Sequence, residues 1–130
     1  MFSHICIGTA DVSRARDFLA DVLAPLSIRF RYADPAGAFI TFEGPAGGRP
    51  LLFVGKPFDG AAAAPGNGNM VALLAADRKA VDACHARALA LGGRDEGAPG
   101  LRAHYHSNYY GAYFRDLDNN KFCVVCHEPG

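Results

Sequence analysis

The chain has 130 residues, of which half are hydrophobic and a fifth charged, and its 13 basic and 13 acidic side chains balance. Such a length and composition are typical of one soluble globular domain and exclude global disorder. Nucleic acid and anionic membrane are not expected partners, because both need a basic surface patch. No apolar run approaches the ~20 residues that span a bilayer, and the first residues lack signal-peptide features, so a cytoplasmic location is expected.

The four cysteines are expected to be free thiols of a reducing compartment, mostly buried as small apolar side chains. Cys123 and Cys126 have CxxC spacing, but a zinc ribbon needs a second such pair, and the other two cysteines stand alone. In a strand, residues three apart also face opposite sides. The spacing therefore does not predict a zinc site.

An internal repeat is the most informative pattern in the chain. Residues 4–11 (HICIGTAD) and 70–77 (MVALLAAD) are offset by 66 positions (70 minus 4), and each has the pattern of a buried strand with a polar end. Asp11 and Asp77 then stand where a carboxylate accepts hydrogen bonds from the first turn of a helix. A strand followed by a capped helix is therefore predicted twice.

Apolar residues at helical spacing follow both aspartates. Pro25 and the Gly92–Gly93 pair are expected to end the two helices. The first apolar stripe contains Val12, Ala15, Phe18, Leu19, Val22, Leu23 and Leu26, and the narrower second one contains Val81, Cys84, Ala88 and Leu91.

Three strands are predicted after each helix, which gives the order βαβββ twice. They cover residues 27–32, 38–43 and 50–54 in the first half, and residues 102–105 (a weak pattern), 109–115 and 121–126 in the second. Pro99 and Gly100 indicate that most of segment 98–108 is a loop. The predicted fold class is α+β, in one domain (1–130) with module one at 1–57, a linker at 58–69 and module two at 70–130. The helices are expected to cover one sheet face, so that the other curves around a cavity.

Two segments resemble the glyoxalase and bleomycin-resistance proteins of the vicinal oxygen chelate superfamily, which also includes extradiol dioxygenases. Residues 4–18 (HICIGTADVSRARDF) resemble the first strand and helix of these proteins. Residues 109–122 (YYGAYFRDLDNNKF) resemble their closing hairpin, usually written R-D-P-D-G-N. The resemblance extends over nearly the whole chain. It implies paired βαβββ modules with curved mixed sheets around a cavity, and a homodimer.

The resemblance also implies where a divalent metal would bind, because metal-dependent members take ligands from the first and last strand of each module. His4 matches this pattern, whereas Met70 stands where His or Gln is usual and Cys123 where a glutamate is typical. The last strand of module one offers only apolar residues 51–53. A catalytic zinc site needs three protein ligands, and the missing carboxylate would also be the general base. A divalent metal held by His4 stays a possible cofactor, and the missing ligands favour its absence.

Single residues leave alternatives open. His4 is either a metal ligand, general base or hydrogen-bond donor to a ligand, or a histidine that only lines the pocket. Cys123 is either a nucleophile activated by His4 or a buried apolar side chain. Strand alternation places Tyr109 and Tyr113 on one face and Tyr110 on the other, without showing which set faces the cavity.

Loops over a cavity often contact ligands, which adds residues from segment 98–108. The predicted ligand-binding residues are His4, Met70, Cys123, Tyr105, His106, Asn108 and Tyr113. Two functions fit this set. The favoured function is binding of a small organic molecule without the usual metal. The alternative is a metal-dependent lyase or dioxygenase with an altered ligand set.

Overall fold

The structure, a computed structural model, describes residues 1–130 and contains two βαβββ modules. Module one consists of β1 (His4–Gly8), α1 (Val12–Val22), the 3-10 turn η1 (Ala24–Leu26), β2 (Arg29–Ala33), β3 (Phe39–Glu43) and β4 (Leu51–Gly55). Module two consists of β5 (Val71–Leu74), α2 (Arg78–Ala90), β6 (Arg94–Leu101), β7 (Tyr110–Arg115) and β8 (Lys121–Cys126). Neither helix has the length and apolarity needed to cross a membrane.

Each module forms its own four-stranded mixed sheet, and the two sheets share one topology. The strand order is β1-β4-β3-β2 in the sheet of module one (sheet A) and β5-β8-β7-β6 in that of module two (sheet B). The first strand of each module pairs in parallel with the last, and all other pairs are antiparallel. The predicted α+β fold with two βαβββ modules is therefore confirmed.

Both helices begin where the aspartates predict. The Asp11 carboxylate accepts from the Arg14 backbone N–H at 3.0 Å, and the Asp77 carboxylate accepts from that of Ala80 at 2.8 Å. These bonds satisfy donors that the first helical turn otherwise leaves free. The α-helix of module one ends three residues before Pro25, which lies in the 3-10 turn η1 instead.

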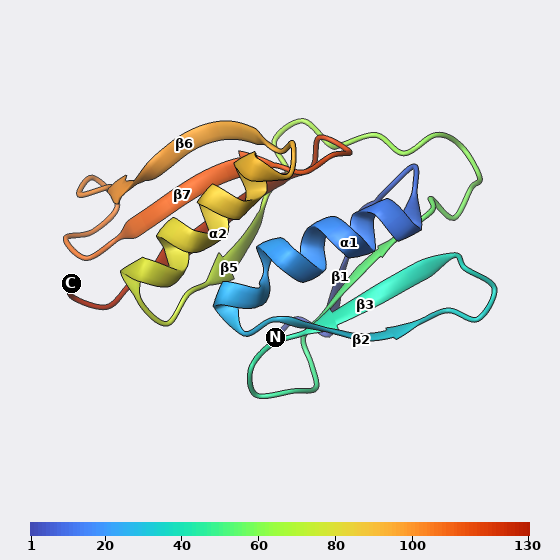
Figure 1. Cartoon of the computed structure of the whole chain (residues 1–130), viewed down its shortest axis with the longest axis horizontal. Helices are drawn as coiled ribbons and strands as arrows, with labels where there is room; N and C mark the ends of the chain where they lie inside the picture. The colour runs from blue at the N-terminus through green and yellow to red at the C-terminus, as the bar shows by residue number, and fades with distance from the viewer.

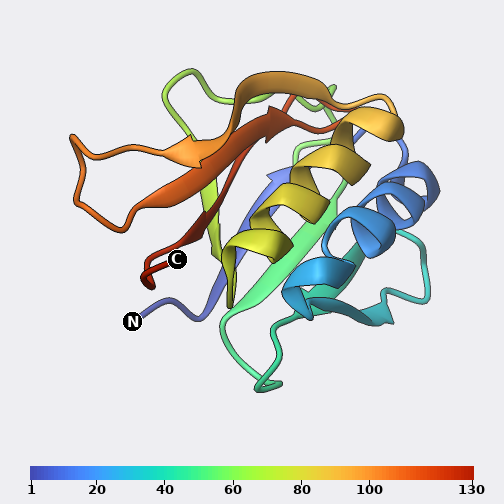
Figure 2. The ribbon, with the colours of Figure 1, turned by 60° about the vertical axis from the view of Figure 1, so that its left-hand side comes forward.

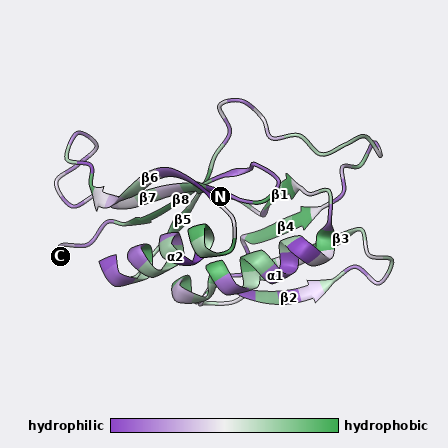
Figure 3. Ribbon diagram, turned by 45° about the horizontal axis from the view of Figure 1, so that its top comes forward, coloured by the Kyte–Doolittle hydropathy of each residue, from purple (hydrophilic) through white to green (hydrophobic).

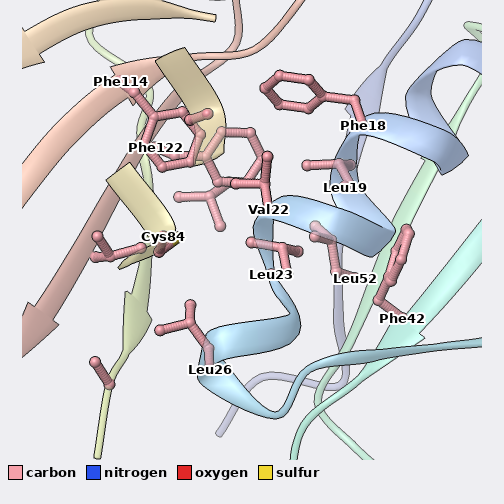
Figure 4. Close-up of a cluster of buried hydrophobic side chains, with 14 of the residues drawn as sticks. Phe18, Leu19, Val22, Leu23, Leu26, Phe42, Leu52, Cys84, Phe114 and Phe122 are labelled. Atoms are coloured by element: carbon pink, nitrogen blue, oxygen red, sulfur yellow. The ribbon is translucent and has the colours of Figure 1, made fainter. Parts of the chain in front are cut away.

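The two helices lie side by side on one side of both sheets (Figures 1 and 2). A cluster of 20 buried side chains fills the space between helices and sheets and extends across both modules. Figure 4 shows Phe18 and Val22 of α1 in this cluster, with Phe114 and Phe122 of sheet B. The opposite faces of the sheets carry no helix, and the linker between β4 and β5 runs on that side (Figure 3). The helix-free faces are therefore where a ligand has access.

One predicted strand was wrong. The strand before β7 is Arg94–Leu101, not residues 102–105, and residues 98–101 belong to it rather than to a loop. Gly97, Pro99 and Gly100 are loop signals in most contexts, but β6 is the edge strand of its sheet. Its pairing with β7 shifts register twice, between Asp95 and Gly97 and between Gly97 and Gly100. Edge strands and bulges tolerate glycine and proline, which explains the error.

Candidate functional site

An aromatic row crosses the helix-free face of sheet A. Ile5 and Ile7 of β1 pack against the core, so strand alternation turns His4 to the opposite face. The His4 ring lies 5.1 Å from that of Phe53, measured between centroids, and Phe53 lies 5.2 Å from Phe39. Tyr32 continues the row at 6.4 Å from Phe39. The four rings come from β1, β4, β3 and β2, the order of the strands in the sheet.

A hollow of about 410 Å³, here called the aromatic hollow, opens beside this row. Phe39, Phe53 and Cys6 line it from the sheet, and Lys56 and Phe58 line it from the segment that follows β4. Phe58 is fully exposed, and Lys56 is the only charged residue in the lining. The hollow is therefore apolar and aromatic, with one cation at its edge.

A second hollow of about 440 Å³, the linker hollow, lies between β1, the start of β5 and linker residues 64–69. Met70, Asn120 and Lys121 line it, and Lys121 is its only charged residue. The two hollows adjoin, because Cys6, Ile7, Gly8 and Ala64 line both. Of the residues predicted to bind a ligand, Met70 alone lines either of these hollows.

The sequence prediction missed Cys6, Phe39 and Phe53, although all three lie on the face that strand alternation assigns to His4. Cys6 is two residues after His4 in β1, and Phe53 is its register partner in the parallel strand β4. The signal was therefore present for Cys6. Phe39 and Phe53 could be assigned to the same place as His4 only with knowledge of how the strands pair.

A second group of side chains lies on the helix-free face of sheet B. It consists of Tyr109, Tyr113 and Cys123 and is called the tyrosine cluster. The Tyr109 hydroxyl is 2.8 Å from the Tyr113 hydroxyl and 3.4 Å from the Cys123 sulfur. Burial raises the pKa of Tyr109 and of Tyr113 above the usual tyrosine value. Tyr110 faces the helix side instead and donates to the Asp82 carboxylate at 2.6 Å. The predicted division of the three tyrosines between two faces is thus observed.

The residues at the superfamily's metal positions do not fit a hard divalent ion within one chain. His4 contacts Ser3, with 2.9 Å between Nδ1 and the hydroxyl, while Cys123 is fully buried and bonded to Tyr109. Neither hollow is lined by His4 or Cys123, and no group of three or more His, Cys, Asp or Glu residues converges on one point. An imidazole, a thioether and a buried thiol are also a poor donor set for such an ion.

The remaining candidates lie in the loop between β6 and β7, outside both hollows. Tyr105 is 61% exposed, and its ring lies tilted against that of Tyr109, with 4.9 Å between the ring centroids. His106 Nε2 lies 2.8 Å from Nδ1 of His127, a residue that sequence reasoning did not select. The Asn108 backbone N–H donates to His106 Nδ1 at 3.2 Å.

Comparison with known proteins agrees with this architecture. Residues 1–124 match the family model described as the Glyoxalase/Bleomycin resistance protein/Dioxygenase superfamily. The chain belongs to this superfamily. No protein with a curated function gives a significant match to this chain.

Solved structures of the superfamily share the fold over almost the whole chain. A glyoxalase/bleomycin resistance protein from Albidiferax ferrireducens T118 is 32% identical, with a TM-score of 0.86 and coverage of 97% of this chain and 98% of that one. A glyoxalase/bleomycin resistance protein/dioxygenase family enzyme from Burkholderia phytofirmans PsJN is 18% identical, with a TM-score of 0.74 and coverage of 97% of this chain and 98% of that one. A lactoylglutathione lyase from Agrobacterium tumefaciens is 21% identical (TM-score 0.67, coverage 97% and 92%) and shows the common fold.

Proposed function

We propose that this member of the superfamily binds a small organic molecule in the aromatic hollow, without the metal that its catalytic relatives use. The observation that carries the proposal is the aromatic row beside the hollow. Aromatic rings are normally buried, because each hides a large apolar area from water. Phe39 and Phe53 instead lie on a sheet face that no helix covers, where a flat ligand can stack on them.

The lining indicates the ligand's chemistry. A volume of about 410 Å³ lies in the range of small-molecule pockets, which are mostly apolar with a few polar groups that fix orientation. Lys56 in the aromatic hollow and Lys121 in the linker hollow are the only charges in the two linings. A flat aromatic or conjugated molecule with an anionic group therefore fits best. Met70 and Cys6 would contact its apolar part from the linker hollow.

We also propose that two copies of the chain form a homodimer through the helix-free side. Several large apolar side chains near this side are exposed, among them Leu74 at 70%, Met70 at 44% and Phe58 at full exposure. Monomeric proteins seldom leave such groups of apolar residues open to water. A second copy over this side would cover them and close the hollows.

The alternative, a metal-dependent lyase or dioxygenase, has less support. It needs a ligand set around His4, and Cys123, at the position typical of a glutamate, is buried beneath Tyr109. A nucleophilic role for Cys123 has the same difficulty, since reactive thiols are partly exposed and lie in electropositive surroundings. Binding without catalysis is therefore the function proposed here.

Fluorescence titration with 8-anilinonaphthalene-1-sulfonate, a flat aromatic anion, tests the proposal. We expect saturable binding that is unchanged by EDTA and weakened by Phe53→Leu. An aromatic contact is worth about 0.5–1.5 kcal/mol, so the affinity should fall about 2- to 12-fold. Lys56→Gln should also weaken binding, whereas Tyr105→Leu, outside the hollow, serves as the matched control.

Two results would contradict the proposal. The first is binding that Phe53→Leu and Tyr105→Leu weaken equally, which would indicate general apolar adsorption. The second is a stoichiometric divalent metal in the purified protein that is lost in His4→Ala, which would support the metal-dependent alternative.

A further inference from the structure

Two histidines from separate segments converge at the end of sheet B. His106 lies in the loop between β6 and β7, and His127 directly follows β8. His106 Nε2 and His127 Nδ1 are 2.8 Å apart, and the two rings are stacked with centroids 5.0 Å apart. Both side chains are exposed to solvent. The Tyr109 ring packs edge-on against both imidazoles, at 5.7 Å and 5.5 Å between centroids.

The hydrogen bonds assign the protons of this pair. The Asn108 backbone N–H donates to His106 Nδ1, so in neutral His106 the proton is on Nε2. That proton points at His127 Nδ1, whose lone pair accepts it. The pair therefore holds one proton between two ring nitrogens that come from different parts of the chain.

The separation of these nitrogens suits a metal ion. Two nitrogens bound at about 2.0 Å to one ion, at right angles, lie about 2.8 Å apart. This is close to the 2.8 Å between His106 Nε2 and His127 Nδ1. Imidazole pairs at right angles occur in tetragonal coordination, which Cu²⁺ and Ni²⁺ prefer. Because both rings are exposed, they can turn their lone pairs toward the ion at small cost.

We propose that His106 and His127 form a binding site for a tetragonal divalent ion, Cu²⁺ or Ni²⁺, with water in the remaining positions. When the ion enters, the proton between the two nitrogens moves to His106 Nδ1, so no net proton is released. The Asn108 N–H then turns from His106 to water. The site uses neither His4 nor Cys123, and Tyr109, which packs against both imidazoles, is hydrogen-bonded to Cys123. It does not depend on the ligand-binding function of the aromatic hollow.

Such an ion would link the β6–β7 loop to the segment after β8, beside the tyrosine cluster. It would also lie close to Tyr109, and thereby to Tyr105, whose ring packs against that of Tyr109. The chain contains no tryptophan and five tyrosines, so tyrosine fluorescence is its intrinsic signal. Cu²⁺ at the site is expected to quench this fluorescence.

The test is a titration of the full chain with CuCl₂, followed by tyrosine fluorescence and electron paramagnetic resonance. A His4→Ala background removes the imidazole near the N-terminus as a competing ligand. We expect one ion per chain, with nitrogen hyperfine structure from two imidazoles. His127→Ala and His127→Asn should each weaken binding at least about tenfold. His104→Ala is the matched control and should leave the affinity unchanged, and excess Mg²⁺ should not compete, because it prefers oxygen ligands.

An affinity that His127→Ala and His127→Asn leave unchanged would overturn the proposal, as would a resonance spectrum with fewer than two nitrogen ligands. Circular dichroism of each variant shows whether it is folded. If the His127 variants were unfolded, the Asn108 amide would decide the question in the His4→Ala protein. Its NMR signal should shift or broaden on addition of Ni²⁺, and an unaffected signal would contradict the site.

Discussion

Asp118 joins the two modules, and its replacement should have a large effect on stability. Its carboxylate accepts hydrogen bonds from the Thr9 hydroxyl at 2.5 Å, the Ala10 backbone N–H at 2.9 Å and the Arg14 guanidinium at 3.0 Å. All three donors belong to module one, while Asp118 lies in the β7–β8 hairpin of module two. The neighbouring Asn120 donates to the Gly8 carbonyl at 2.9 Å, at the wall of the linker hollow.

The expected loss in the free energy of unfolding follows from how exposed these groups are to solvent. The Asp118 side chain is 7% exposed, and hydrogen bonds to a charged group contribute about 1.5–3 kcal/mol when they are well shielded. Arg14 is 44% exposed, so its ion pair adds less than about 1 kcal/mol. Asp118→Ala should therefore cost about 3 kcal/mol in the free energy of unfolding. For a chain of this length, that loss lowers Tm by about 10 °C.

Thermal and urea unfolding at pH 7, followed by circular dichroism, measure this effect. Asp118→Asn should lose about half as much, because it keeps an acceptor for the Ala10 N–H but loses the charge. Asp17→Ala, which removes an exposed carboxylate of α1 with no hydrogen bond or ion pair, is the matched control. A Tm for Asp118→Ala within about 2 °C of that control would refute the reasoning that the hairpin joins the modules.

Two further predictions concern the buried groups. In the folded protein only Cys6 should react promptly with 5,5′-dithiobis(2-nitrobenzoic acid), because the other three thiols are buried and burial raises the pKa of Cys84 to about 12. The Cys6→Ser protein should therefore show no prompt reaction, and prompt reaction of any thiol in that variant would disprove this. Burial also raises the pKa of Tyr109 and of Tyr113, which means that folding favours the neutral phenols. The stability that these neutral phenols contribute is therefore present below about pH 10, and it is lost as the pH rises beyond that value. Urea unfolding between pH 8 and pH 11 should show this loss, and Tyr109→Phe should reduce it; equal losses in both proteins would count against the tyrosine cluster.

The elements of the repeat were predictable because their signals are local. The helix starts depend on one aspartate each, and the buried faces depend on apolar spacing within a single helix or strand. Both patterns predict the same local structure wherever the helix has a sheet to pack on. Tyr109 and Tyr113 were assigned to one face for the same reason, because alternation is a property of the strand itself.

The candidate site was less predictable because it depends on the pairing of strands and on irregular segments. Phe39 and Phe53 become neighbours only when β3 pairs with β4, and Lys56 and Phe58 reach the hollow from the segment that follows β4. His127 follows the last strand without any periodic pattern around it. The superfamily resemblance pointed to His4 and Cys123, and in the structure these residues lie outside the two hollows. The resemblance therefore predicted the fold, while the roles that it implies for His4 and Cys123 stay predictions.

The location of a bound ligand tests the central claim most directly. With the protein labelled in its phenylalanine rings and the same naphthalene sulfonate as ligand, intermolecular nuclear Overhauser effects report which rings the ligand contacts. We expect contacts to Phe39 and Phe53 in the native protein, and loss of the Phe53 contact in Phe53→Leu with the Phe39 contact weakened. Contacts confined to other parts of the surface, with Phe39 and Phe53 unaffected at saturation, would contradict ligand binding in the aromatic hollow.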